Sequence, residues 1–195
     1  MTKVSFVDFV PQGGYQPSPY PGNYPPTQQP YPQSPGSEAL PSHGGLLSNC
    51  RGNKKALLIG INYFGQRGEL KGCINDVNNI KNLIQSRGFR ESAMVILTDD
   101  QRDPQFQPTR ENIIEGMLWL VSGAQPNDSL FFHYSGHGSK TGDHDGDEVD
   151  ESDETICPLD YKSAGQIVDD EMNALLVQQL PRGARYVIIF LNLTF

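Results

Sequence analysis

Between residues 54 and 190, short apolar segments alternate with segments whose apolar residues recur at helical spacing. The apolar segments are typical of strands buried on both faces, and they lie at 55–62, 93–98, 129–135 and 185–190. Helices are predicted over 73–87, with Gly88 as C-cap, from the N-cap Thr109 onward, and over 169–180. This alternation predicts an α/β fold in which helices cover both faces of a mainly parallel sheet. Ligand sites in such sheets lie beyond the carboxyl ends of the strands.

Residues 11–47 have a different composition from the rest of the chain. They hold ten of the fifteen prolines and four of the eight tyrosines, and Glu38 is their only charged residue. A segment without apolar periodicity cannot bury enough surface to offset the entropy lost on ordering. We therefore expect a disordered Pro/Gln/Tyr-rich leader and linker over residues 1–51, followed by a folded domain over residues 52–195.

Charge and cysteine content limit the partners and the compartment. The formal net charge of −8 argues against a general binder of nucleic acid or of anionic membranes, because both would repel an acidic surface. Three cysteines fit a reducing compartment better than a disulfide framework. The first ten residues do not resemble a signal peptide, and no run approaches the ~18 apolar residues of a membrane span. We expect a cytoplasmic protein, with the nucleus open as a second location.

A histidine between two glycines follows the third predicted strand, in the sequence Tyr-Ser-Gly-His-Gly at residues 134–138. Glycine allows unusual backbone angles and close approach of a substrate, so we expect a loop in which the imidazole of His137 stands exposed at the sheet edge. Taken alone, a histidine in a loop also fits a plain turn or surface role. His133 cannot share a metal ion with His137, because four strand residues span about 13 Å. We expect His133 to pack beneath the site.

Five motifs resemble, in order and spacing, the catalytic domain of type I metacaspases, which are caspase-like cysteine peptidases. The motifs are Lys55–Asn62, Gly72–Asp76, Tyr134–Gly138, Asp145–Glu148 and Ile167–Glu171. The resemblance covers roughly residues 52–190, and the leader is similar to the prodomain of fungal members. It implies a caspase-like three-layer sandwich around a mainly parallel sheet.

The resemblance also implies a Cys–His dyad that cleaves peptide bonds after Arg or Lys. His137 takes the position of the histidine, which assists formation of the thiolate and then protonates the leaving amine. Cys73, Asp76 and Ser135 match positions of the substrate pocket, where acidic side chains favour a cationic residue. From the residues alone, Cys73 also fits a buried thiol and Asp76 a carboxylate favoured by the helix dipole. Proteins or peptides that contain Arg or Lys are the expected partners.

Eight carboxylates fill residues 143–154, a density that usually marks a solvated loop. The segment is not an EF-hand, because Gly146 falls at the wrong place and no helical pattern flanks it. The resemblance nonetheless implies activation by Ca²⁺, and the matching positions are Asp153, Asp169 and Asp170, which supply hard oxygen ligands. The alternative for Asp169 and Asp170 is capping of a helix N-terminus. Ca²⁺ is the expected activator, with no organic cofactor.

The last residues depart from the family pattern. The family nucleophile lies in an Asp-Ser-Cys-His-Ser-Gly motif after the strand predicted at 185–190, but here the sequence continues as Leu191–Phe195. Leu193 stands where the cysteine belongs, and Leu191 stands where a pocket aspartate belongs. A leucine cannot attack a carbonyl group, so this chain is expected to be inactive, with a peptidase domain that is incomplete at its C-terminus.

Two other functions stay open at this point. One is a catalytically dead protein that binds partners or basic peptides, and the other is a calcium-binding module. The full-length enzyme is expected to be a monomer and to lose its prodomain by self-cleavage, for which Lys54 and Lys55 are candidate sites. In the incomplete domain, the strand at 185–190 would have an uncovered edge or face, which predicts poor solubility.

Overall fold

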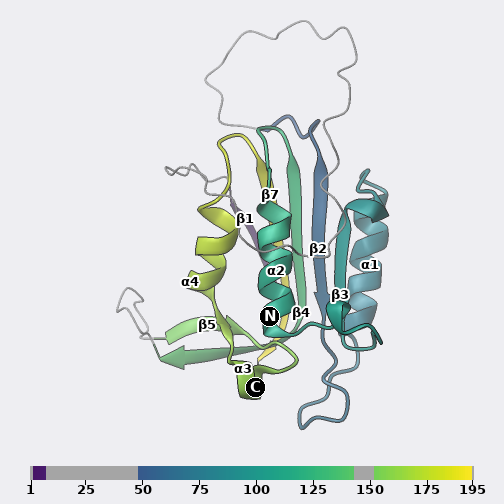
Figure 1. The fold of residues 1–195 in the computed structure, drawn as a ribbon, viewed down its shortest axis with the longest axis vertical. Helices are drawn as coiled ribbons and strands as arrows, with labels where there is room; N and C mark the ends of the chain where they lie inside the picture. The colour runs from purple at the N-terminus through teal and green to yellow at the C-terminus, as the bar shows by residue number, and fades with distance from the viewer. Residues whose placement is uncertain (1, 8–47, 143–151, 195) are drawn as a thin grey trace, which may run out of the picture.

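The computed structural model describes residues 2–7, 48–142 and 152–194, and it shows a sheet with helices on both faces (Figure 1). The strands are β1 (Thr2–Val7), β2 (Lys54–Gly60), β3 (Met94–Thr98), β4 (Ser129–Gly142), β5 (Ser152–Ile156), β6 (Ile167–Val168) and β7 (Arg185–Thr194). The helices are α1 (Cys73–Gln85), α2 (Arg110–Val121), α3 (Tyr161–Ala164) and α4 (Asp169–Met172). Short turns of helix lie at η1 (Glu91–Ala93), η2 (Pro104–Phe106) and η3 (Asn173–Val177), the last of which continues α4. The predicted alternation of strands and helices is confirmed.

Four parallel strands form the centre of the sheet, in the order β7-β4-β2-β3. At one edge β1 pairs antiparallel with β7. Beyond the carboxyl end of the parallel strands, β5 pairs antiparallel with the last part of β4, and β6 pairs with β5. The sheet is therefore mainly parallel, as predicted, and β4 lies at its centre.

Two apolar clusters, one on each face of the sheet, hold the helices in place. Leu58 of β2 packs with Val77 and Ile84 of α1. Its neighbour Leu57 joins the other cluster, with residues of α2 and η3 such as Met117. The two faces differ because successive side chains of a strand point in opposite directions. The result is the predicted three-layer sandwich of helix, sheet and helix, which Figure 1 shows with α2 and α4 in front of the sheet.

The ends of the two longer helices follow the sequence signals. Thr109 precedes α2, and its hydroxyl accepts a hydrogen bond from the backbone N–H of Asn112 at 3.3 Å. Gly88 follows α1 with a φ of +86°, a left-handed conformation in which glycine carries no steric cost.

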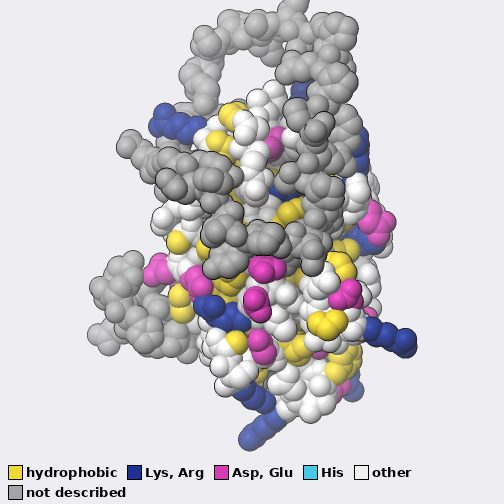
Figure 2. Space-filling model, in the orientation of Figure 1, with side chains coloured by type: hydrophobic (Ala, Val, Ile, Leu, Met, Phe, Trp, Pro, Cys, Tyr) yellow, Lys and Arg dark blue, Asp and Glu magenta, His cyan; other side chains and the backbone are white. Residues whose placement is uncertain are grey.

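No helix of the described residues is both long enough and apolar enough to cross a membrane. In Figure 2, acidic and basic side chains are interspersed on the face that is shown.

Strand β4 corrects the prediction of a loop after Ser135. The strand continues to Gly142, and Gly136–Gly138 pair in parallel with Asn192–Thr194 of β7. From Gly138 onward, β4 also pairs antiparallel with β5. The two glycines that suggested a loop therefore lie inside a strand, because partners far along the chain supply the hydrogen bonds of a ladder there.

Two further expectations about strands are corrected. Residues 2–7 lie within the leader that was expected to be disordered, but they form β1. The strand at 185–190 was expected to have an uncovered edge or face, and β1 pairs with one edge of β7. Residues 8–47 lie outside the described residues.

Lys54 and Lys55 begin β2 and pair with Ser129 and Leu130 of β4, so the backbone at these two candidate cleavage sites is held in the sheet.

Candidate active site

His137 lies near the carboxyl end of the central strand and is only 5% exposed. The expectation of an exposed imidazole is therefore wrong. The connection between β2 and α1 folds over the histidine, and the backbone carbonyl of Gly68 lies 2.6 Å from its Nε2 atom. On the same connection, the ring of Tyr63 lies 4.6 Å from the imidazole, centroid to centroid, with 34° between the planes.

The contact with Gly68 has a chemical consequence for the imidazole of His137. A carbonyl oxygen can only accept a hydrogen bond, so Nε2 must carry the proton that it donates. In a neutral imidazole this leaves the lone pair on Nδ1, which can then take a proton. The fold therefore holds His137 in the tautomer of a base that acts through Nδ1.

Gly136 shows why a glycine stands next to this histidine. A Cβ atom at that position would lie 2.6 Å from the hydroxyl oxygen of Tyr134 and 3.0 Å from that of Tyr63. Both tyrosines are fully buried, so neither can move aside easily. The glycine is required by this close approach, and not by a loop conformation.

The three predicted pocket residues come together on the α1 side of the sheet. The hydroxyl of Ser135 on β4 donates a hydrogen bond of 2.7 Å to a carboxylate oxygen of Asp76 in the first turn of α1. Cys73, the first residue of the same helix, is 2% exposed. Burial raises the pKa of the Cys73 thiol, and hydrogen bonding with Ser135 opposes that rise. The structure thus gathers one carboxylate, one hydroxyl and one protonated thiol near the end of β4.

Asn62 is a site residue that the sequence reasoning missed. Its side-chain oxygen accepts hydrogen bonds from the backbone N–H groups of Gly72 and Cys73, at 3.3 and 3.1 Å. Its own N–H donates to Asp99 at 3.0 Å. Asn62, in the connection that follows β2, therefore caps α1 and fixes the helix that carries Asp76. The available signal was a polar residue at the end of a buried apolar run.

His133 packs beneath the site, as predicted. It is fully buried, and its Nδ1 atom lies 3.2 Å from the backbone carbonyl of Ile189, to which it can donate. Its Nε2 atom has no hydrogen-bond partner among the described residues. Burial lowers the pKa of His133 to about 4, so this imidazole is neutral near pH 7.

The cysteines of the chain are poor nucleophiles or lie apart from the histidine side chain. Burial raises the pKa of both Cys73 and Cys157, so both remain thiols at neutral pH. The pKa of Cys50 is lowered, chiefly by a hydrogen bond from Arg185, but Cys50 lies before β2 at the opposite end of the parallel strands. Position 193, which takes the nucleophile's place by family resemblance, pairs with His137 in the β4–β7 register.

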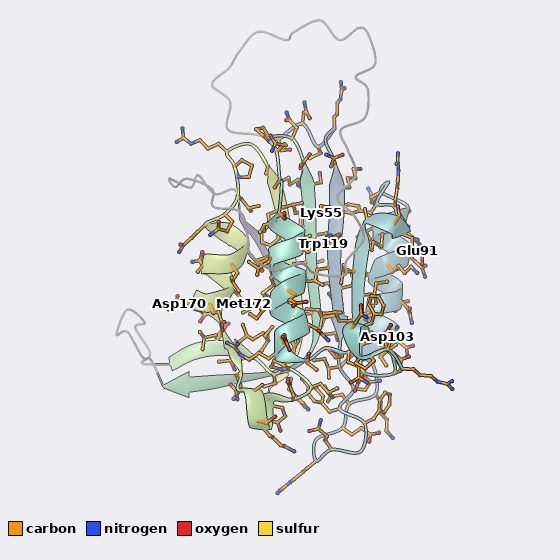
Figure 3. The ribbon with its side chains drawn as sticks, viewed as in Figure 1. Lys55, Glu91, Asp103, Trp119, Asp170 and Met172 are labelled. Atoms are coloured by element: carbon orange, nitrogen blue, oxygen red, sulfur yellow. The ribbon has the colours of Figure 1, made fainter. Side chains whose placement is uncertain are left out.

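The residues expected to bind calcium lie on adjacent elements. Thr155 of β5 pairs with Val168 of β6; Asp153 lies earlier on β5, and Asp169 follows Val168 as the first residue of α4. Asp169 and Asp170 open α4, where one Asp169 oxygen accepts a hydrogen bond from the Asp170 N–H at 3.2 Å. Figure 3 shows Asp170 at the end of α4 that lies toward β5. The side chain of Asp153 lies outside the described residues, and the described side chains contain no group of three that could hold a metal ion.

The comparisons with known proteins agree with this arrangement. The family model for the metacaspase peptidase C14 domain matches residues 54–191. Metacaspase-1 of Ajellomyces capsulatus is 52% identical over 190 residues, which cover 89% of this chain and 52% of that protein. Metacaspase-1 of Coccidioides immitis is 60% identical over 144 residues, which cover 73% of this chain and 31% of that protein.

One solved structure adds support at the level of the fold. A crystal structure of a protein from Geobacter sulfurreducens aligns with a TM-score of 0.55 and 29% sequence identity, over 70% of this chain and 48% of that one. The chain spans about half or less of the length of the curated relatives named above. Together with the geometry around His137, these matches show that the chain belongs to the metacaspase family of cysteine peptidases, whose fungal members are similar to it over most of its length.

Proposed function

We propose that this chain carries the histidine and the substrate pocket of a cysteine endopeptidase that cleaves after Arg or Lys. One observation supports the proposal most strongly, and it is the register between β4 and β7. In that register His137 pairs with position 193 and Ser135 pairs with position 191. These are the positions where family resemblance expects the nucleophilic cysteine and a pocket aspartate.

The proposed reaction uses His137 twice. With a cysteine at position 193, the Nδ1 atom of His137 takes the thiol proton, and the thiolate attacks the carbonyl carbon of the scissile bond. The imidazolium then gives this proton to the leaving amine, and an acyl-enzyme remains. Water hydrolyses the acyl-enzyme and restores the thiol. The Gly68 carbonyl keeps Nε2 protonated throughout, so that Nδ1 is the atom that exchanges protons.

The cationic preference is assigned to the pocket at the start of α1. Asp76 supplies a carboxylate, and Ser135 holds it in place through the 2.7 Å hydrogen bond. A carboxylate in a partly buried pocket attracts a guanidinium or an ammonium group, because low local polarity strengthens the interaction of the charges. A substrate with Arg or Lys before the scissile bond satisfies that carboxylate, whereas one with Asp is repelled by it.

Leu193 and Leu191 make this chain inactive in the proposal, since neither leucine can replace a thiol or a carboxylate. A double variant, Leu191→Asp with Leu193→Cys, tests the proposed roles directly. In this variant a peptidyl-arginine chloromethyl ketone should alkylate the thiol at position 193, forming a carbon–sulfur bond as chloride leaves. Mass spectrometry of the digested protein locates the label, and Cys50 serves as the internal reference for a thiol that lies away from His137.

The controls separate the histidine from the pocket. Adding His137→Ala to the double variant should slow labelling at position 193 by about 100-fold, in line with the loss of a general base. Adding Asp76→Asn should remove the preference for an arginyl over an aspartyl reagent. Labelling at position 193 that is insensitive to both changes would contradict the proposal.

A second function rests on the pocket alone. The Asp76–Ser135 contact is present in the chain that has Leu193, so the chain as it stands has the groups to bind a basic peptide without cleaving it. Binding of an arginine-containing peptide to the unaltered chain, weakened at least tenfold by Asp76→Asn, would support this function. The two functions use the same pocket and differ in whether the bound peptide is cleaved.

Activation by Ca²⁺ is part of the proposal. The donor set of Asp153, Asp169 and Asp170 is of the right chemical type, because Ca²⁺ prefers carboxylate oxygens. When bound there, the ion would link β5 to α4 and neutralise repulsion between the carboxylates. Isothermal titration calorimetry of the chain with Ca²⁺ should show binding that Asp169→Asn with Asp170→Asn abolishes. Absence of binding heat at millimolar Ca²⁺ would remove calcium from the proposal.

A further inference from the structure

Three segments that are distant in the sequence meet around the backbone of His137. Tyr63 follows β2, Tyr134 lies on β4, and Cys157 follows β5. All three residues are buried, with exposed fractions of 1%, 0% and 4%. Burial raises the pKa of both tyrosines, so both hydroxyl groups stay neutral and can donate hydrogen bonds.

The hydroxyl of Tyr63 binds two backbone groups at this point, one as acceptor and one as donor. It accepts a hydrogen bond of 3.0 Å from the backbone N–H of His137. It donates one of 2.6 Å to the carbonyl oxygen of Cys157. It also lies 3.0 Å from the hydroxyl of Tyr134. The Tyr134 hydroxyl in turn can donate its one proton to the carbonyl oxygen of His137, at 2.8 Å, so both tyrosine hydroxyls contact the backbone of this histidine.

The ring of Tyr63 contacts the same histidine from another direction. It lies against the imidazole of His137 at 4.6 Å, while the Gly68 carbonyl holds the Nε2 atom. Tyr63 therefore touches both the main chain and the side chain of His137.

We propose that Tyr63 is a positioning residue for His137. Its ring holds the plane of the imidazole against the Gly68 carbonyl, and its hydroxyl ties the His137 backbone to Cys157 at the end of β5. This inference deepens the proposed function and rests on the role that His137 has there. It also makes the orientation of the imidazole depend on β5, the strand that carries Asp153.

The plain alternative is that Tyr63 only fills the core. Tyr186 offers a matched control for that reading. It is a buried tyrosine on β7, and its hydroxyl has no hydrogen-bond partner among the described residues. Tyr186→Phe therefore removes a buried hydroxyl that makes no hydrogen bond to His137.

The experiment compares Tyr63→Phe, Tyr63→Leu and Tyr186→Phe in the full 195-residue chain by NMR. Tyr63→Phe keeps the ring and removes the hydroxyl, so exchange of the His137 amide proton should rise by about tenfold or more, the effect of losing one buried hydrogen bond. Tyr63→Leu removes the ring as well, and the fraction of imidazole protonated at Nδ1 should then rise severalfold, as read from the ¹⁵N shifts of the ring nitrogens. Tyr186→Phe should change neither quantity.

The inference is overturned if both Tyr63 variants leave the His137 amide exchange and the imidazole tautomer as they are in Tyr186→Phe. Should a Tyr63 variant fail to fold, the unaltered chain provides the test. A slowly exchanging Tyr63 hydroxyl proton with a nuclear Overhauser effect to the His137 amide is expected, and its absence in the folded chain would contradict the inference. These NMR measurements require no catalysis. A negative result would contradict the role of Tyr63 without bearing on the labelling at position 193.

Discussion

Strand β4 passes through two different environments although it is buried along most of its length. Its first part, with Leu130, Phe131 and Phe132, packs in the two apolar clusters. Its carboxyl end, with Ser135 and His137, is as well buried but polar, and each of these side chains is held by a named hydrogen bond. Apolar packing depends mainly on volume, whereas a buried polar group depends on particular partners. The first part of β4 therefore builds the fold, and the second part builds the site.

The largest expected effect lies in the apolar part. Phe132 is fully buried between α2 and the sheet and contacts the ring of Phe190 at 5.8 Å between centroids. Phe132→Ala should lower the free energy of unfolding by about 3–5 kcal/mol, through lost burial and the cavity that remains. Urea denaturation measures this loss. Phe132→Leu should lower the free energy of unfolding clearly less. Equal losses for the two variants would show that side-chain volume does not determine stability in the apolar part of β4.

The polar end should be sensitive to one added carbon atom. Gly136→Ala places a methyl group 2.6 Å from the Tyr134 hydroxyl, which has no free space to move into. We expect a loss of about 1–3 kcal/mol by denaturation, together with a changed His137 imidazole signal in NMR. Gly72→Ala is the control, since a Cβ atom there meets nothing within 4 Å. If the Gly136→Ala protein were as stable as the Gly72→Ala protein, the close approach at the polar end would not require a glycine at position 136.

The apolar end contains one charged exception, Lys55, which pairs with Leu130 in the sheet register. Its ammonium group donates to the carbonyls of Trp119 and Ser122 and lies 4.5 Å from the centre of the Trp119 ring, and Figure 3 shows the two side chains together. Burial lowers the pKa of Lys55 to about 8 from 10.5, and Asp128 opposes this shift. The carbonyls and the ring also favour the charged form.

A lowered folded-state pKa makes the stability of the chain depend on pH. Between about pH 8 and pH 10.5 the unfolded chain binds the Lys55 proton more strongly than the folded chain, so unfolding becomes harder as the pH rises. The gain should be about 1–2 kcal/mol, measured as the difference between the chain and Lys55→Met. Cys73 and Cys157, whose raised pKa values act in the opposite direction, are present in both proteins, so their contributions cancel in this difference. A difference that falls with pH would contradict the assignment.

The smallest expected effect on stability comes from removing the buried hydroxyl of Tyr186. Tyr186 pairs with Leu130 at the apolar end, and its buried hydroxyl has no hydrogen-bond partner among the described residues. Tyr186→Phe should change the free energy of unfolding by less than about 0.5 kcal/mol or should stabilise the chain. Thermal unfolding gives the value. A loss above 1 kcal/mol would reveal a partner for that hydroxyl.

The sequence predicted the apolar part of this comparison better than the polar part. Strand and helix positions follow from local periodicity, which is why β2, α1 and the N-cap Thr109 lie where they were expected. The burial of His137 could not be predicted in this way, because it depends on the Gly68 carbonyl, 69 residues away in sequence. The strand conformation of Gly136–Gly138 likewise depends on pairing with β7, which local glycine signals do not report.

The same reason explains the residues that were missed. Tyr63 and Asn62 end an apolar run, and nothing local distinguishes them from ordinary strand-end residues. Their importance comes from contacts with His137 and with the start of α1. By contrast, Cys73, Asp76 and Ser135 were named through family resemblance, and the structure places them close to one another.

As proposed, the carboxyl end of β4 forms a pocket for a cationic side chain. The most direct measurement is a titration of the isotope-labelled, unaltered chain with benzamidinium, which mimics the arginine side chain, followed by NMR. We expect saturable shifts centred on Cys73, Asp76 and Ser135, and we expect Asp76→Asn to abolish them. Shifts that centre elsewhere, or none at millimolar benzamidinium in a folded chain, would contradict it.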